Sequence, residues 1–177
     1  MIATATKLVS IQNNSDIVFL IDEYSTALYR FCKGITYSKE DADDLFQDTW
    51  ESIIRKPFKI DMARNPVSIL CAEAMYIWKS KQRKYARRKR LAPEEVLNYE
   101  PDSGANLEED YLSKAEKDHV NKIVTKLPDK YRIPLILYYR MEMGLIEIGK
   151  ILDLPTGTIN THMKWQIKST IFWQSMI

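Results

Sequence analysis

A run of cations in the middle of the chain has the composition of a nucleic-acid contact. The stretch "KSKQRKYARRKR", from Lys79 to Arg90, contains no acidic residue, includes Tyr85 and directly follows Trp78. Cations neutralise phosphates and release counterions, while aromatic rings stack on unpaired bases. The pattern predicts contact with nucleic acid that has a single-stranded part. The alternative is a solvated, charged helix end that pairs with an acidic segment elsewhere in the chain.

A second stretch, "IEIGKILDLPTGTINTHMKWQIK", predicts two helices joined by a tight turn. Each predicted helix carries an apolar stripe, formed by Ile146, Ile148, Ile151, Leu152 and Leu154 on the first and by Ile159, Met163, Ile167 and Ile171 on the second. Gly149 would allow the crossing helices to approach closely, while Pro155 and Gly157 would supply a stiff, tight connection. The two stripes can therefore face each other, as in a helix-turn-helix.

The outer face of the second predicted helix is polar. With the apolar stripe inward, the residues that fall largely outward are Asn160, Thr161, Lys164, Trp165 and Lys168. Amide, hydroxyl and ammonium groups suit base edges and phosphates, so this face predicts contact with a DNA major groove. The alternative is an ordinary helical hairpin with a solvated polar face.

An acidic row precedes the basic run. Asp41, Asp44 and Asp48 are spaced by three and four, which places their carboxylates along one side of a helix. Because no set of partner ligands accompanies them, we expect a solvated or protein-binding face here in preference to a metal site. His119 and His162 are isolated, so we expect no catalytic constellation, metal, cofactor or small-molecule substrate.

The first half of the chain predicts three helices. Apolar residues recur at three and four from Ile17 to Gly34, and Ser38 opens a second helix, "SKEDADDLFQDTWESIIRK", close to a capping box. A third helix is predicted from about Val67 into the basic run, because Pro66 suits a first helical turn and no breaker follows. The stretch "LAPEEVLNYEPDSGANLEEDY" then predicts a linker, since it combines prolines, a glycine and many carboxylates without periodicity.

The second half predicts a helix near residues 111–126, a helix that starts at Pro128 and is bent by Pro134, and the helix-turn-helix. No strand alternation and no internal repeat are visible, so the predicted fold is all-α. The predicted domains are residues 1–90 and 112–177, joined by the acidic linker of residues 91–111.

The composition of the whole chain agrees with a helical globular protein. Its 177 residues are 45% hydrophobic and 28% charged, and the net charge of +2 conceals opposite charges in separate segments. Cys32 and Cys71 lack ligand-spaced partners, which suits buried thiols in a reducing compartment. No run long enough to span a bilayer and no signal-peptide pattern is visible, so a cytoplasmic location is expected.

Three stretches in this order together resemble a bacterial RNA polymerase sigma factor of the extracytoplasmic-function (ECF) group in the sigma-70 family. They are "YSKEDADDLFQDTW", the basic helix ending "RKYARRKR", and "LPDKYRIPLILYYRMEMGLIEIGKILDLPTGTINTHMKWQIKSTI". The resemblance implies a sigma-2 and a sigma-4 domain, joined by a linker and bound to RNA polymerase core enzyme, and neither domain is a catalyst. A stand-alone helix-turn-helix transcriptional regulator is the alternative function, and it would need a dimer to read paired half-sites.

The resemblance also assigns residues to partners. Residues carried over as polymerase-binding are Asp44, Leu45, Gln47 and Asp48. Residues carried over as facing the −10 promoter element are Trp78, Lys79, Arg83, Lys84, Tyr85, Arg87 and Arg88. Residues carried over as facing the −35 promoter element are Thr158, Asn160, Thr161, His162, Lys164, Trp165 and Lys168. Promoter DNA and core enzyme are therefore the expected partners.

The resemblance further implies regulation and an acidic path through the polymerase. Family members are commonly inhibited by an anti-sigma factor, often membrane-bound, so we expect such a partner. The linker carboxylates that would follow a cationic route meant for RNA are Glu94, Glu95, Glu100, Asp102, Glu108, Glu109 and Asp110. Glu73 and Tyr76 depart from the family's pattern, as apolar and Asn residues are usual there, and His162 and Trp165 stand where basic residues are frequent.

Overall fold

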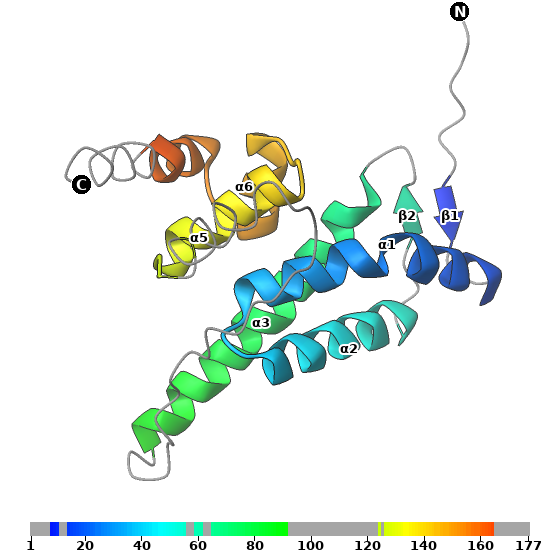
Figure 1. Ribbon diagram of the computed structural model, residues 1–177, viewed down its shortest axis with the longest axis horizontal. Coiled ribbons are helices and arrows are strands. Elements are labelled where there is room, and N and C mark those ends of the chain that lie inside the picture. The colour runs from blue at the N-terminus through cyan, green and yellow to red at the C-terminus, as the bar shows by residue number, and fades with distance from the viewer. Residues whose placement is uncertain are drawn as a thin grey trace, which may run out of the picture.

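The computed structural model describes residues 8–10, 14–55, 59–61, 65–91, 124 and 126–164. Within them a long helix, α3 (Pro66–Leu91), lies against α1 (Asn14–Ile35) and α2 (Lys39–Arg55), and its far end projects beyond both (Figure 1). The second half packs on the same body through α5 (Asp129–Leu135) and α6 (Leu145–Leu152). The predicted all-α class is confirmed.

Local signals explain where the helices of the first half begin. The Ser38 hydroxyl accepts a hydrogen bond of 3.0 Å from the Asp41 backbone N–H, which caps α2 as the sequence predicted. Asn65 does the same for α3, because its side-chain oxygen accepts from the Val67 N–H at 3.1 Å, and Pro66 occupies the first turn.

Two short strands correct the expectation that the chain has none. β1 (Leu8–Ser10) pairs antiparallel with β2 (Lys59–Asp61), with Val9 opposite Ile60. Three residues are too few to produce a visible alternation, and the pairing joins segments that are distant in sequence.

The helix predicted to start at Pro128 is present as α5, with Pro128 as its N-cap residue, and Pro134 changes the helix that follows. α5 runs directly into five residues of π-helix, η2 (Ile136–Arg140), so the hydrogen-bond ladder widens just beyond the proline. η2 ends before the loop that leads to α6. The proline therefore distorts the helix without ending it.

The helix-turn-helix is present as predicted. α6 ends at Leu152, its C-cap residue Asp153 has a left-handed φ of 58°, and a second helix is described over residues 156–164. A Cβ on Gly149 would stand only 2.8 Å from the Leu154 carbonyl oxygen, so the turn folds back onto α6 only because this residue is glycine. Ile159 and Met163 are buried, which confirms the inward stripe over the described part.

One buried cluster of apolar side chains extends through both halves of the described chain. It includes Phe31 of α1, Leu45 of α2, Leu70 of α3, Leu137 of η2 and Ile148 of α6, all fully buried. The predicted linker beyond Leu91 and most of the predicted helix at 111–126 lie outside the described residues. The predicted domain boundaries stay a prediction.

Candidate nucleic-acid and protein-binding surfaces

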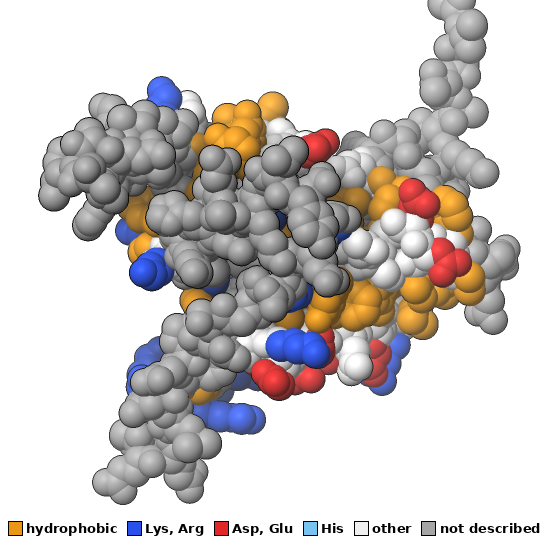
Figure 2. Space-filling model, in the orientation of Figure 1, with side chains coloured by type: hydrophobic (Ala, Val, Ile, Leu, Met, Phe, Trp, Pro, Cys, Tyr) orange, Lys and Arg blue, Asp and Glu red, His pale blue; other side chains and the backbone are white. Residues whose placement is uncertain are grey.

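The C-terminal part of α3 is a solvent-exposed basic rod. Every residue from Arg83 to Leu91 is exposed, which includes the candidates Arg83, Lys84, Tyr85, Arg87 and Arg88. Lys and Arg side chains gather around this end of the helix in Figure 2. Tyr85, 44% exposed, lies among them with its ring available for stacking. The arrangement suits a nucleic-acid backbone with unpaired bases.

Two candidates nearer the core, Trp78 and Lys79, are engaged within the protein. Trp78 is only 5% exposed, lies 6.2 Å from the Tyr37 ring, and its Nε1 has no acceptor among the described residues. The Lys79 ammonium donates a hydrogen bond of 2.8 Å to the Leu152 carbonyl at the end of α6. Trp78 is therefore buried in this arrangement, Lys79 remains exposed, and the assignment of both to DNA stays a prediction.

The acidic residues of α2 differ in their surroundings. Asp44 and Gln47 are exposed, whereas Asp48 forms an ion pair of 2.7 Å with Lys81 of α3. Leu45 is fully buried, so it holds α2 in the core and does not offer surface to a partner, which corrects its assignment as a contact. No group of residues suited to a metal ion occurs among the described residues. This face is suited to binding a protein.

The two departures from the family's pattern, both on α3, differ in exposure. Glu73, 9% exposed, accepts a hydrogen bond of 2.6 Å from the Ser52 hydroxyl of α2. Tyr76 is 63% exposed. Glu73 therefore joins α3 to α2, while Tyr76 adds an aromatic ring to the outer surface of α3.

The predicted −35 face is partly exposed. Asn160, Thr161 and Lys164 are exposed, and the Thr161 hydroxyl donates to the Gly157 carbonyl at 2.9 Å. Thr158 and His162 are half-buried, and the His162 ring meets the Tyr131 ring edge-on at 5.4 Å. The candidates Trp165 and Lys168 lie outside the described residues.

A polar contact that was not predicted from the sequence joins the two halves. Arg132, 2% exposed, donates to the Ile35 carbonyl at 3.0 Å and to Asp129 at 2.7 Å. Its guanidinium lies 4.6 Å from the centre of the Tyr37 ring, and the Tyr37 hydroxyl donates to Asp129 at 2.7 Å. The only available signal was an arginine within an apolar run, "YRIPLILYY".

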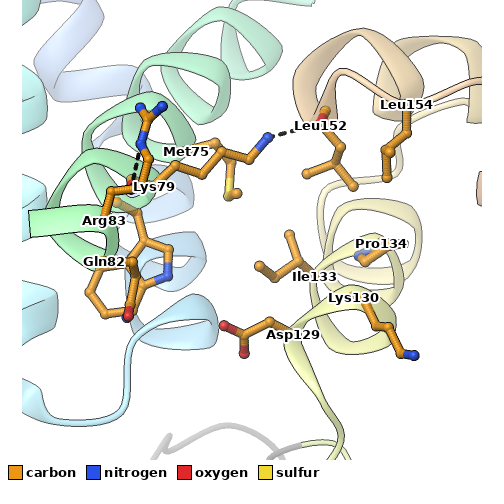
Figure 3. Close-up of a pocket in the computed structure, with 11 residues that line it drawn as sticks. Met75, Lys79, Gln82, Arg83, Asp129, Lys130, Ile133, Pro134, Leu152 and Leu154 are labelled. Atoms are coloured by element: carbon orange, nitrogen blue, oxygen red, sulfur yellow. Dashed lines mark hydrogen bonds between the residues drawn. The ribbon is translucent and has the colours of Figure 1, made fainter. Parts of the chain in front are cut away.

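A cleft of about 510 Å³ opens along the same junction (Figure 3). One wall of the cleft belongs to α3 and includes Met75, Lys79, Gln82 and Arg83. The other wall belongs to the second half and consists of Asp129, Lys130, Ile133, Pro134, Leu152 and Leu154. Its walls combine apolar surface with three cations and one carboxylate. This composition suits a partner with apolar and acidic side chains.

The described cysteines offer no chemistry. Burial raises the pKa of the Cys32 thiol to about 12 and that of Cys71 well above its ordinary value. Both are free thiols, as expected, and a thiol that stays protonated is a poor nucleophile. Among the described residues, no helix is long and apolar enough to cross a membrane.

Comparison with known proteins gives one consistent pattern. Residues 20–68 match the family model for Sigma-70 region 2. The chain is 28% identical over 151 residues to the ECF RNA polymerase sigma factor SigW of Bacillus subtilis (strain 168), with 81% of each protein covered.

Two solved structures share the fold. One is the sigma factor RpoE in complex with the anti-sigma factor NepR from Bartonella quintana, with a TM-score of 0.70, 18% identity, and 85% of this chain and 91% of that chain covered. The other is CnrH in complex with the cytosolic domain of CnrY, with a TM-score of 0.59, 15% identity, and 93% of this chain and 91% of that chain covered.

Proposed function

We propose that this chain is a member of the ECF group of the sigma-70 family, and that it binds RNA polymerase core enzyme and directs it to promoters. The observation that carries the proposal is the similarity to an ECF sigma factor over 151 residues, which spans both halves of the chain. The mechanism is binding: the protein selects the promoter and helps to open its strands, and it carries out no catalytic step.

Core enzyme would bind the exposed face of α2. Asp44 and Gln47 are exposed on this helix, and Asp48 could exchange its ion pair with Lys81 for one with the polymerase. The buried stripe that includes Leu45 fixes the helix rigidly, so the carboxylates are presented in one geometry. Charge then supplies register and association rate, while neighbouring apolar contacts supply affinity.

Co-elution with bacterial core enzyme on a sizing column tests this surface. Asp44→Ala should weaken co-elution, because it removes an exposed carboxylate from the proposed contact. Asp22→Ala is the matched control, since Asp22 is an exposed carboxylate on α1. Wild-type protein that is folded and inhibitor-free but does not co-elute would overturn the proposed function. Equal weakening by both variants would remove α2 as the binding face.

Promoter DNA would contact two separate surfaces. The basic end of α3 would hold the melted −10 strand through its cations and Tyr85, and the helical segment 156–164 would enter the major groove of the −35 element. Lys84→Gln should reduce open-promoter formation by the holoenzyme and flatten its salt dependence, because one phosphate contact is lost. An unchanged salt dependence would contradict the assignment.

The proposed domains are residues 1–90 and 112–177, with residues 91–111 as the linker through the polymerase interior. The surfaces proposed for polymerase and for the −10 strand fall in the first domain, and the surface proposed for the −35 element falls in the second. As part of the same proposal the protein acts in the cytoplasm, where core enzyme acts, and requires no cofactor.

An anti-sigma factor is the proposed regulatory partner. The solved structure of RpoE, which shares this fold, contains the anti-sigma factor NepR. In this chain the cleft between α3 and α5 would accept an inhibitor helix with apolar and acidic side chains, because Lys79, Arg83 and Lys130 surround its apolar walls. A purified complex with the inhibitor should fail to bind core enzyme. A complex that binds core as well as the free protein would contradict this role.

A stand-alone helix-turn-helix regulator is not favoured. The match of residues 20–68 to Sigma-70 region 2 lies wholly outside the helix-turn-helix, and a regulator of that kind would have no use for it. The similarity to an ECF sigma factor covers 81% of this chain, which also disfavours a stand-alone regulator.

A further inference from the structure

The outer face of α3 carries an exposed aromatic ring as well as cations. Tyr76 is 63% exposed, against 5% for Trp78 two residues later. It is not among the residues that line the cleft, whose α3 wall includes Met75 and Lys79 (Figure 3). The second half therefore packs against α3 without covering the Tyr76 ring.

Tyr76 lies on the same side of α3 as two exposed arginines. Arg83 and Arg87 follow it by about two and three helical turns, so the three side chains form one stripe. The helical rise places Tyr76 about 10 Å along the axis from Arg83, which is the length of about three stacked nucleotides. Tyr85 follows Tyr76 by about two and a half turns and so lies on the opposite side of the helix. A single strand that follows the stripe would meet one ring and two cations.

These side chains suit a single strand better than a duplex. Cations hold phosphates without regard to sequence, and an aromatic ring stacks on any base, because every base has a π-face. Within a duplex those faces are covered by the neighbouring base pairs, so a ring can reach them only after the strands separate. Asparagine is the family's usual residue at position 76, and its amide would bind the edge of a base. Tyrosine replaces that edge contact with a stacking surface.

We propose that Tyr76 binds the melted −10 strand by stacking on one unpaired base, while Arg83 and Arg87 hold phosphates of the same strand. The proposal rests on the proposed function, because it assumes that α3 meets this strand. It has two consequences. The strand position that meets Tyr76 should accept any base, and the ring can bind with the second half in place, since Tyr76 is exposed where Trp78 is buried.

Titration of the holoenzyme with two labelled strands of equal length tests the stacking. One strand is oligothymidylate, and the other is the same sugar-phosphate chain with every position abasic. Tyr76→Ala should weaken oligothymidylate binding about five- to twentyfold, as expected for one base on an aromatic ring, and should leave binding of the abasic strand unchanged. Tyr76→Phe keeps the ring and should bind both strands as wild type does. Tyr139→Ala is the matched control, since Tyr139 is also 63% exposed but lies on η2, and it should change neither affinity.

The pair of strands distinguishes a lost stack from a structural defect. A defect in α3 would weaken both strands equally, and that result would overturn the proposal. Tyr76→Ala that binds oligothymidylate as tightly as wild type would overturn it as well, as would Tyr76→Phe that binds as weakly as Tyr76→Ala. With oligodeoxyadenylate and oligodeoxycytidylate the loss should be of similar size. A loss confined to one base would indicate recognition of a base edge and would also overturn stacking.

Co-elution with core enzyme, measured on the same preparations, separates the two proposals. Wild-type protein that does not bind core would overturn the proposed function. Wild-type and Tyr76→Ala proteins that bind core equally, and also bind oligothymidylate equally, would overturn the role of Tyr76 and leave the proposed function intact.

Discussion

Arg132→Met removes the charged group at the centre of the junction and keeps most of its apolar volume. The guanidinium is 2% exposed, and it caps the C-terminal end of α1 by donating to the Ile35 carbonyl at 3.0 Å. It also lies 4.6 Å from the centre of the Tyr37 ring and pairs with Asp129. Loss of these contacts should destabilise the protein.

The size of the effect follows from the separate contributions. An unsatisfied buried carbonyl costs about 1–3 kcal/mol, and a desolvated cation–π contact contributes about 1–2 kcal/mol. The ion pair with Asp129 adds little, because the Asp129 side chain is 36% exposed and already accepts the Tyr37 hydroxyl. Removing a buried guanidinium also relieves its desolvation penalty, so the net loss in free energy of unfolding should be about 2–3 kcal/mol.

Thermal unfolding followed by circular dichroism measures this loss. For a chain of this size about 2–3 kcal/mol corresponds to a decrease in Tm of about 4–12 °C. Arg55→Met is the control, since the ion pair of Arg55 among the described residues is an exposed one with Glu51 on the same helix, and its Tm should fall by about 2 °C or less. An Arg132→Met protein that melts with the Arg55→Met protein would refute the reasoning.

Two further predictions concern the turn and the thiols. In a urea titration, Gly149→Ala should lower the free energy of unfolding by about 1–3 kcal/mol, because its Cβ would stand 2.8 Å from the Leu154 carbonyl oxygen. Gly157→Ala is the control and should lower it far less, because a Cβ there meets nothing within 4 Å. Burial raises the pKa of Cys32 to about 12, so about one thiol in ten thousand is ionised at pH 8. Cys32 and Cys71 should therefore react with a thiol reagent only after unfolding, and rapid reaction of the native protein would contradict their burial.

Features set by neighbouring residues could be predicted from the sequence. The Ser38 cap, the start of α3 at Pro66 and the turn around Gly149 all depend on side chains within a few residues of the backbone they control. The family resemblance assigned partners to α2 and to the basic end of α3, and those assignments stay predictions. These predictions needed no knowledge of how the two halves pack.

Features set by distant contacts could not be predicted. The pairing of β1 with β2 and the contact of Arg132 with Ile35 each join segments far apart in the sequence. Leu45 illustrates a second reason why sequence prediction falls short. Its place in the family's motif assigned it to the polymerase contact, whereas its side chain is packed in the core. The same packing explains Glu73, a charged residue at a usually apolar position, which accepts from Ser52 of the neighbouring helix.

The junction divides α3 into two parts with different availability. Trp78 is buried and the Lys79 ammonium donates to the Leu152 carbonyl, while every residue from Arg83 to Leu91 is exposed. Phosphate attraction acts over a distance of about 8–10 Å in physiological salt, whereas stacking requires direct contact with a ring. The protein therefore exposes the cations and the Tyr85 ring at the end of α3 and buries the Trp78 ring. Among the residues predicted to face the −10 element Trp78 alone is buried, so in this arrangement the exposed cations and Tyr85 would have to make the proposed contact.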